Sequence, residues 1–206
     1  MIILCFRVKN VMLTFYIILL IFFSSLYFVF LISLVFFYLS GFVSLIFGAP
    51  YIPLSKKLIL KVLAFGGLSS TDIFYDLGCG DGRLLMSGVY DFNTSKAVGY
   101  EIAPWPYLKT KFLIKYNHLK TIDIFRKNFL KANISQATFI YMYLFPKLVN
   151  KMAHKISTEG TYKTKILCVE FPIDVDKHIE FKLLKSEKIH NLMVYLYELK
   201  PRNPLR

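Results

Sequence analysis

A short run between Asp76 and Gly82, with the sequence Asp-Leu-Gly-Cys-Gly-Asp-Gly, carries residue types that suit close ligand binding. Its three glycines stand at alternate positions, which favours a backbone that turns sharply and approaches a ligand closely. Larger side chains would fill the space that such a ligand needs. The candidate binding residues of this run are Asp76, Gly78, Cys79, Gly80, Asp81 and Gly82.

The run differs from the glycine pattern that binds dinucleotides. Its third glycine comes one residue early, and Asp76 ends the apolar strand predicted before it. The Asp76 carboxylate would repel a pyrophosphate, but it can accept hydrogen bonds from an ammonium group. Free amides of the loop and of the following helix start can meet a carboxylate. The amino acid end of S-adenosylmethionine carries both groups, so the run predicts this cofactor.

A second acidic residue supports the same ligand. Glu101 ends the next apolar strand, 19 residues beyond Gly82. In doubly wound sheets, an acid at this place accepts hydrogen bonds from the ribose hydroxyls of a nucleoside. Glu101 is therefore the predicted ribose-binding residue.

Alternating apolar and helical patterns place these residues in an α/β fold. The alternation of strands with helices predicts a doubly wound, mostly parallel sheet of seven strands. The last two strands are joined by too few residues for a crossover helix, so they should form an antiparallel hairpin. The expected strands are 72–76, 97–101, 122–125, 138–143, 165–171, 181–188 and 192–199, and the expected helices are 54–64, 83–90, 104–117 and 146–156.

The N-terminal segment is predicted to anchor the chain in a membrane. Residues 11–47 are almost wholly apolar and uncharged, and a membrane-spanning helix needs about 20 such residues. The segment could form one tilted helix or a re-entrant hairpin broken at Ser24-Ser25 or Ser40-Gly41, and a single span is favoured. A signal peptide does not fit, because its apolar core is only about 7 to 15 residues long.

The distribution of charge predicts the orientation of the span and the partners of the domain. More basic residues follow the apolar segment than precede it, which favours the C-terminal side as cytoplasmic, or as its matrix equivalent. The chain after this segment has 24 of the 26 Lys and Arg residues and all 13 acidic residues, a net charge of +11. Anionic lipid headgroups and nucleic acid would both attract this charge. Because of the anchor, the lipid bilayer is the expected partner and nucleic acid is not.

The three cysteines and four histidines have no metal-ligand spacing, so no metal is expected. The predicted organisation is an N-terminal tail and transmembrane segment (1–48), an S-adenosylmethionine-binding domain (49–200) and a frayed C-terminus (201–206).

The segment from Phe74 to Arg83, followed by Val98-Gly99-Tyr100-Glu101, resembles class I S-adenosylmethionine-dependent methyltransferases. More narrowly, the chain is similar to the small membrane-anchored lysine methyltransferases that modify the ATP synthase c subunit and the adenine nucleotide translocase. This narrower likeness depends on the apolar anchor, the segment 49–55, and Asp81-Gly82-Arg83 with the segment 99–105.

This resemblance implies further site residues. Tyr51, Pro53 and Ser55 would pack against the cofactor, although a rigid elbow after the anchor would also explain the prolines. Asn128, with Phe129 beside it, would reach the adenine, and Asn can both donate and accept hydrogen bonds there. Tyr143 and Phe145 would line the channel for the methyl acceptor, unless they serve only as core packing.

The resulting prediction is a membrane-anchored protein-lysine N-methyltransferase that acts on a membrane protein. An apolar acceptor channel would favour the neutral amine that such transfer requires, because desolvation disfavours the charged form. One alternative is a methyltransferase for a lipophilic small molecule, such as a quinone or a lipid precursor. Another is a catalytically silent membrane module that only binds the cofactor.

Overall fold

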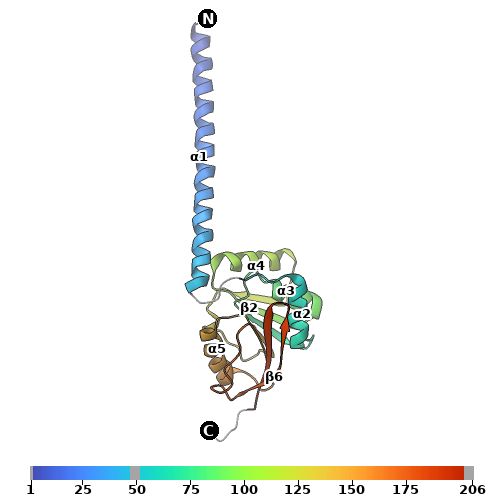
Figure 1. The fold of residues 1–206 in the computed structure, drawn as a ribbon. Helices are drawn as coiled ribbons and strands as arrows, with labels where there is room; N and C mark the ends of the chain where they lie inside the picture. Colours follow the sequence, from blue (N-terminus) through green and yellow to red (C-terminus); the bar gives the residue numbers. More distant parts are fainter. Residues whose placement is uncertain (1, 47–51, 202–206) are drawn as a thin grey trace. The chain divides into compact units, whose positions relative to one another are not determined.

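A computed structural model describes residues 2–46 and 52–201, and it divides the chain into two compact units, residues 1–40 and 41–206. Helix α1 (Ile2–Ile46) runs for 45 residues without a break, including at Ser24-Ser25 and at Ser40-Gly41 (Figure 1). It is therefore one helix and not a hairpin. Its segment Val11–Phe42 has a mean hydropathy of 2.7 and is long and apolar enough to cross a membrane.

The second unit contains the predicted seven-stranded sheet. The strand order is β3-β2-β1-β4-β5-β7-β6, in which β1 to β5 run parallel and β7 is antiparallel to both β5 and β6. The predicted doubly wound fold with a C-terminal hairpin is thus confirmed. The strands are β1 (Ile73–Leu77), β2 (Lys96–Tyr100), β3 (Ile122–Phe125), β4 (Phe139–Met142), β5 (Lys165–Val169), β6 (Phe181–Ile189) and β7 (Leu192–Leu199).

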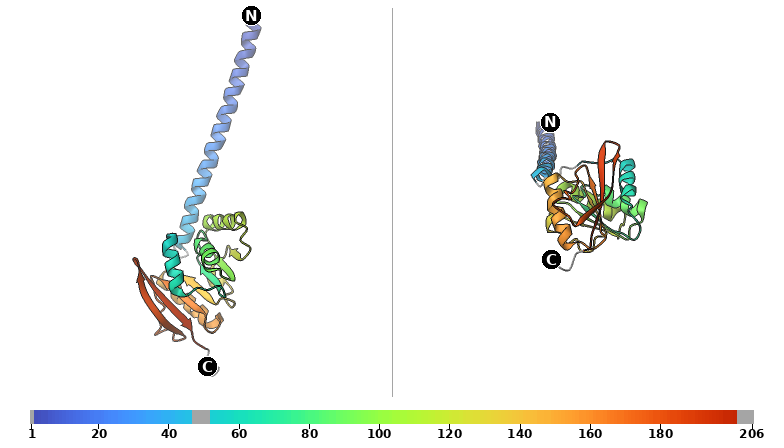
Figure 2. Two further views of the ribbon diagram at one scale, coloured as in Figure 1. Left: turned by 90° about the vertical axis from the view of Figure 1, so that its right-hand side faces the viewer. Right: turned by 60° about the horizontal axis from the view of Figure 1, so that its bottom comes forward.

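Helices cover both faces of this sheet, as Figures 1 and 2 show. Apolar side chains of α5 belong to a core on one face, and those of α2 and α3 belong to a core on the other. The helices are α2 (Lys56–Gly66), α3 (Arg83–Phe92), α4 (Pro104–Tyr116) and α5 (Pro146–Glu159), with a short 3-10 helix η1 (Phe129–Lys131).

Local sequence signals explain where these helices begin and end. The Ser55 hydroxyl accepts a hydrogen bond from the amide of Leu58 at 3.4 Å and so caps α2, as its sequence predicts. Gly67 ends α2 in the left-handed conformation. Pro104 and Pro146 stand at the first positions of α4 and α5, where the missing amide hydrogen costs nothing.

A partly buried ion pair fixes the edge of the sheet where the parallel strands begin. The Asp72 carboxylate accepts hydrogen bonds from Lys165 Nζ at 2.9 Å and from Thr138 Oγ1 at 2.8 Å. Burial acts to raise the pKa of Asp72, but the hydrogen bonds from Lys165, Ser69 and Thr138 outweigh it and lower that pKa. This cluster links β5, β4 and the start of β1, and it leaves the opposite edge of the sheet for the ligand.

Candidate functional site

The topology directs attention to the carboxyl ends of β1 and β4, where the strand order reverses. In open α/β sheets, ligands bind outside the carboxyl ends of the strands at such a point. The glycine run follows β1 there, and Glu101 follows β2, which pairs with β1 in register from Ile73 opposite Lys96 to Leu77 opposite Tyr100. Parallel pairing therefore brings the two sequence signals together.

The backbone of the glycine loop adopts conformations that other residues rarely reach. Gly78, Gly80 and Gly82 have φ values of 92°, 55° and 74°. At Gly82, an added Cβ atom would come within 2.3 Å of the Thr110 methyl group on α4. The Thr110 hydroxyl donates to the Gly80 carbonyl at 2.9 Å. The loop is thus held closely against α4. Gly78 and Gly80 are favoured by their backbone conformation, and Gly82 is required by both conformation and space.

Glu101 lies buried beside this loop. One carboxylate oxygen accepts a hydrogen bond from the Gly80 amide at 2.9 Å, and the other accepts one from the Ala103 amide at 2.7 Å. Burial raises the pKa of Glu101, and these backbone donors oppose the rise. Each oxygen retains a lone pair for a further donor, as binding of two ribose hydroxyls requires.

Asp76 is the least satisfied polar group of the site. Its side chain is buried, and its Oδ2 atom has no hydrogen-bond partner within residues 52–201. Burial, followed by the negative charges of Glu101 and Asp81, raises the pKa of Asp76 to about 8. A positively charged donor would relieve both the missing hydrogen bond and the repulsion. The residues present therefore fit the ammonium group of S-adenosylmethionine.

Arg83 joins the loop to the segment that precedes α2. Its guanidinium donates to the Asp81 carboxylate through Nε at 2.8 Å and Nη2 at 2.7 Å, and its Nη1 donates to the Leu54 carbonyl at 2.8 Å. Lys109 Nζ also pairs with Asp81, at 3.0 Å. Because its carboxylate already has these two cationic partners, Asp81 serves mainly to hold Arg83 and α4 in place.

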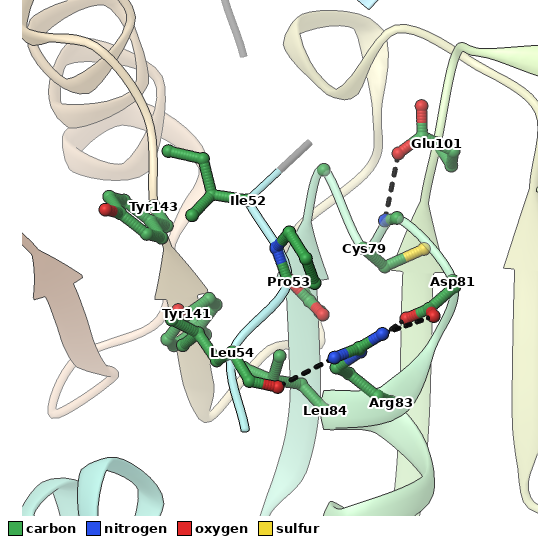
Figure 3. Close-up of a pocket in the computed structure, with 13 residues that line it drawn as sticks. Ile52, Pro53, Leu54, Cys79, Asp81, Arg83, Leu84, Glu101, Tyr141 and Tyr143 are labelled. Carbon is green, nitrogen blue, oxygen red and sulfur yellow. Dashed lines mark hydrogen bonds and ion pairs between the residues drawn. The ribbon is translucent and has the colours of Figure 1, made fainter. Parts of the chain in front are cut away.

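A pocket of about 550 Å³, including its mouth, opens between the glycine loop, the end of β4 and the segment before α2 (Figure 3). Most of the residues proposed from the sequence line it together. Those residues are Pro53, Asp76, Gly78, Cys79, Gly80, Asp81, Glu101 and Tyr143.

The other proposed residues are not among those that line this pocket. Gly82 begins α3 and faces Thr110, and the Ser55 hydroxyl caps α2. Asn128 caps η1 by accepting from the Leu130 amide at 2.9 Å. Their roles toward a cofactor remain predictions.

Three aromatic residues complete the list of sequence-based candidates. Phe129 is buried in the core on the α5 face of the sheet. Phe145 is half exposed at the start of α5, with its ring edge-on to Phe171. Tyr51 lies outside the described residues.

The pocket also contains residues that the sequence reasoning missed, namely Ile52, Leu54, Arg83, Leu84 and Tyr141. Tyr141 had a usable signal, because side chains two apart in a strand share a face and Tyr143 was already a candidate. The register adds that Tyr141 stands opposite Asp76. Burial raises the pKa of the Tyr141 hydroxyl well above its ordinary value, so this group stays neutral beside Asp76.

The sequence matches a known protein family and is similar to known lysine methyltransferases. The family described as the ANTKMT methyltransferase domain matches residues 76–179, about half of the chain. A protein-lysine N-methyltransferase from Saccharolobus islandicus is 34% identical over 125 residues, which cover 60% of this chain and 78% of that protein. A lysine N-methyltransferase of Xenopus laevis, named for the C subunit of ATP synthase, is 25% identical over 130 residues, covering 60% of this chain and 54% of that protein.

Solved structures support the fold. An RNA methyltransferase from Salinibacter ruber, solved with S-adenosyl-L-homocysteine, superposes with a TM-score of 0.67 over 75% of this chain and 98% of its own, at 22% identity. At this identity the likeness extends to the architecture and not to the substrate.

Proposed function

Given that the chain belongs to the ANTKMT methyltransferase family of S-adenosylmethionine-dependent protein-lysine methyltransferases, we propose that it is anchored in a membrane and methylates a lysine of a membrane protein. In this proposal, residues 1–48 form the anchor, residues 49–200 form the enzyme domain, and residues 201–206 are a tail. The domain lies on the cytoplasmic side, or on the matrix-equivalent side. The ATP synthase component for which the frog relative is named is the kind of substrate we have in mind.

The observation that carries the proposal is a pair of buried carboxylates on either side of a loop without side chains. Asp76 has an unpartnered oxygen that suits an ammonium group, and Glu101 presents two oxygens that suit ribose hydroxyls. The alternating glycines leave room for the ligand to lie between them. S-adenosylmethionine supplies an electrophilic methyl group on its sulfonium centre when bound.

The chain contributes binding, orientation and exclusion of water. Asp76 and Glu101 would fix the two ends of the ligand, which sets the direction in which the methyl group faces. Tyr143, Tyr141 and Ile52 form an apolar wall on the side of the pocket away from Glu101 (Figure 3). We assign this wall to the acceptor.

A lysine acceptor must be neutral to attack, whereas a free lysine has a pKa of about 10.4. The Tyr143 side of the pocket would desolvate the amine and so favour loss of its proton. Partial burial of Tyr143 already raises the pKa of its own hydroxyl, and the negative charge of Glu170 adds to the effect. This hydroxyl remains protonated at neutral pH and can accept a hydrogen bond from an approaching amine.

The membrane part of the proposal rests on α1. Its segment Val11–Phe42 exceeds the length of about 20 residues that a span needs, and its side chains are exposed along that length. A helix with this surface would not be soluble on its own. Anchoring would hold the enzyme domain beside other membrane proteins.

A labelling experiment tests the function. The full chain in detergent is incubated with methyl-labelled cofactor and membranes from its own organism, and labelled residues are located by mass spectrometry. We expect label on a lysine of a membrane protein, loss of that label with Glu101→Gln, and no loss with the matched control Glu187→Gln, which alters an exposed carboxylate on β6.

Other distributions of label would replace the proposal with an alternative. Label in an organic extract would identify a quinone or a lipid precursor as the acceptor. Tight binding of cofactor without transfer to any membrane fraction would identify a silent cofactor-binding module. Label confined to RNA would contradict the lysine assignment.

A further inference from the structure

Helix α4 presents a row of large apolar side chains to solvent. Trp105, Leu108, Phe112 and Tyr116 are 46%, 49%, 65% and 72% exposed. They stand three or four residues apart, and at about 100° per residue they fall within an arc of about 80°. The rings of Phe112 and Tyr116 stack on one another at 5.9 Å, so the row is a continuous surface, which we call the α4 stripe.

Lysines border the α4 stripe on both sides. By the same helical geometry, Lys109 lies beside one edge, and Lys111 and Lys115 lie beside the other. The helix contains no acidic residue. An apolar face that includes Trp, bordered by lysines, is typical of helices that lie in the interface of a bilayer. The stems of Lys111 and Lys115 can cover apolar surface while their ammonium groups reach the headgroups, whereas the ammonium group of Lys109 is paired with Asp81.

The opposite side of α4 holds the cofactor loop. Thr110 is buried, donates to the Gly80 carbonyl at 2.9 Å and closely contacts Gly82. Lys109 reaches Asp81 at 3.0 Å. One short helix therefore has the glycine loop on its inner side and an exposed aromatic surface on its outer side.

We propose that the α4 stripe binds the interfacial region of an anionic lipid bilayer and thereby fixes the orientation of the cofactor pocket relative to the membrane surface. The favoured occupant is lipid, because the row of Trp and Tyr matches the aromatic belt of membrane interfaces and the bordering lysines match anionic headgroups. The net charge of +11 after the apolar segment acts in the same direction. A tether through α1 would make even a weak contact well populated.

This inference rests on the membrane location proposed above but not on methyl transfer. Because the test measures tryptophan fluorescence and not activity, absence of methyl transfer would leave the lipid contact standing, and absence of the lipid contact would leave methyl transfer standing. The chain offers a direct probe, because Trp105 is its one tryptophan.

The full chain is reconstituted into vesicles of phosphatidylcholine alone or of phosphatidylcholine with phosphatidylglycerol. We expect Trp105 emission to shift to shorter wavelength relative to the protein in detergent, to be quenched by lipids brominated on their acyl chains, and to be protected from aqueous acrylamide. All three effects should be larger in the vesicles that contain phosphatidylglycerol. Full access of acrylamide to Trp105, without quenching by brominated lipid, would overturn the proposal.

Variants separate the apolar contribution from the charged one. Phe112→Asp with Tyr116→Asp should abolish quenching by brominated lipid in both vesicles. Lys111→Gln with Lys115→Gln should remove the difference between the two lipid compositions. Tyr162→Asp, at an aromatic outside α4 that is 52% exposed, is the control and should change neither.

Calorimetry with S-adenosylhomocysteine checks that each variant is folded. None of these substitutions touches the pocket. Quenching that persists in a folded Phe112→Asp, Tyr116→Asp protein would also contradict a role for the α4 stripe.

Discussion

Replacing Asp76 with asparagine should stabilise the ligand-free protein and weaken cofactor binding at the same time. The pKa of Asp76 is about 8 in the fold, against an ordinary value of 3.8. At pH 7 the folded side chain is therefore mostly protonated, whereas the unfolded one is ionised. Protonating a carboxyl with a pKa of 3.8 at pH 7 costs about 4 kcal/mol of folding free energy, at 1.36 kcal/mol per pH unit. Asparagine keeps the shape and avoids this cost.

The effect should depend on pH in a defined direction. Below about pH 4 both states of the wild-type protein carry the proton, and the Asp76 carboxyl causes no loss of stability. From about pH 4 to pH 8 only the unfolded state releases it, so the free energy of unfolding falls as the pH rises. The Asp76→Asn protein should lack this fall. At pH 7, its melting temperature should exceed that of the wild type by roughly 8–16 °C, at 2–4 °C per kcal/mol.

Cofactor binding should respond in the opposite sense. A hydrogen bond to a charged group contributes about 1.5–3 kcal/mol, so the Asp76→Asn protein should bind S-adenosylhomocysteine roughly 10- to 100-fold more weakly. Wild-type affinity should rise about tenfold from pH 6 to pH 7, because binding requires the ionised carboxylate. It should then level off near pH 8, where the carboxylate is ionised and the ligand's own amine begins to lose its proton.

Thermal melting and titration calorimetry on the full chain in detergent, at pH 6 and pH 7, would measure both effects. Glu187→Gln on β6 makes the same replacement of a carboxyl by an amide at an exposed site and should alter neither quantity. The reasoning would be refuted if Asp76→Asn melted below the wild type, or if it kept the affinity and the pH dependence of the wild type.

Three further substitutions test other parts of the structure. Gly82→Ala should lower the free energy of unfolding by about 2–5 kcal/mol, because the backbone is left-handed there and the new Cβ atom would lie 2.3 Å from the Thr110 methyl group. Denaturant titration should show partial recovery when Thr110→Ser removes that methyl group. Lys165→Gln should cost roughly 3 kcal/mol at pH 7, and this loss should shrink as the pH falls below 3.8 and Asp72 is protonated. Tyr143→Ala should slow methyl transfer roughly 10- to 100-fold while leaving the affinity for S-adenosylhomocysteine nearly unchanged. Equal losses of rate and affinity would assign Tyr143 to cofactor binding instead of the acceptor channel.

Much of the site could be predicted because its signals are local. Asp76 and Glu101 each follow an apolar strand, and the glycines follow Asp76 directly. Parallel strands end at the same edge of a sheet, so the alternation of strands and helices predicts that these residues lie close together. The N-terminal segment was equally clear, because an uncharged, mostly apolar stretch of 32 residues in one helix needs no tertiary contact to be identified.

Other parts of the site depend on long-range packing. Arg83 is two residues from Asp81, but its hydrogen bond to the Leu54 carbonyl spans 29 residues and has no signature in sequence. Asn128 was expected to reach an adenine; its side-chain oxygen caps η1 through a local bond from the Leu130 amide, and its role toward an adenine stays a prediction. Propensity identifies the residues that can form such bonds but not the partner that tertiary packing supplies.

The sequence by itself determined the order of the chemical groups along the chain: an apolar segment, a strand that ends in an aspartate, a glycine loop and a second acidic residue. Only the tertiary structure decided that Tyr141 stands beside Asp76, that Asp76 keeps an unpartnered oxygen, and that α4 exposes its aromatic side. The reason is physical. Periodicity is set by neighbours a few residues apart, whereas burial, register and the surroundings of a charge are set by segments that meet only when the chain has folded.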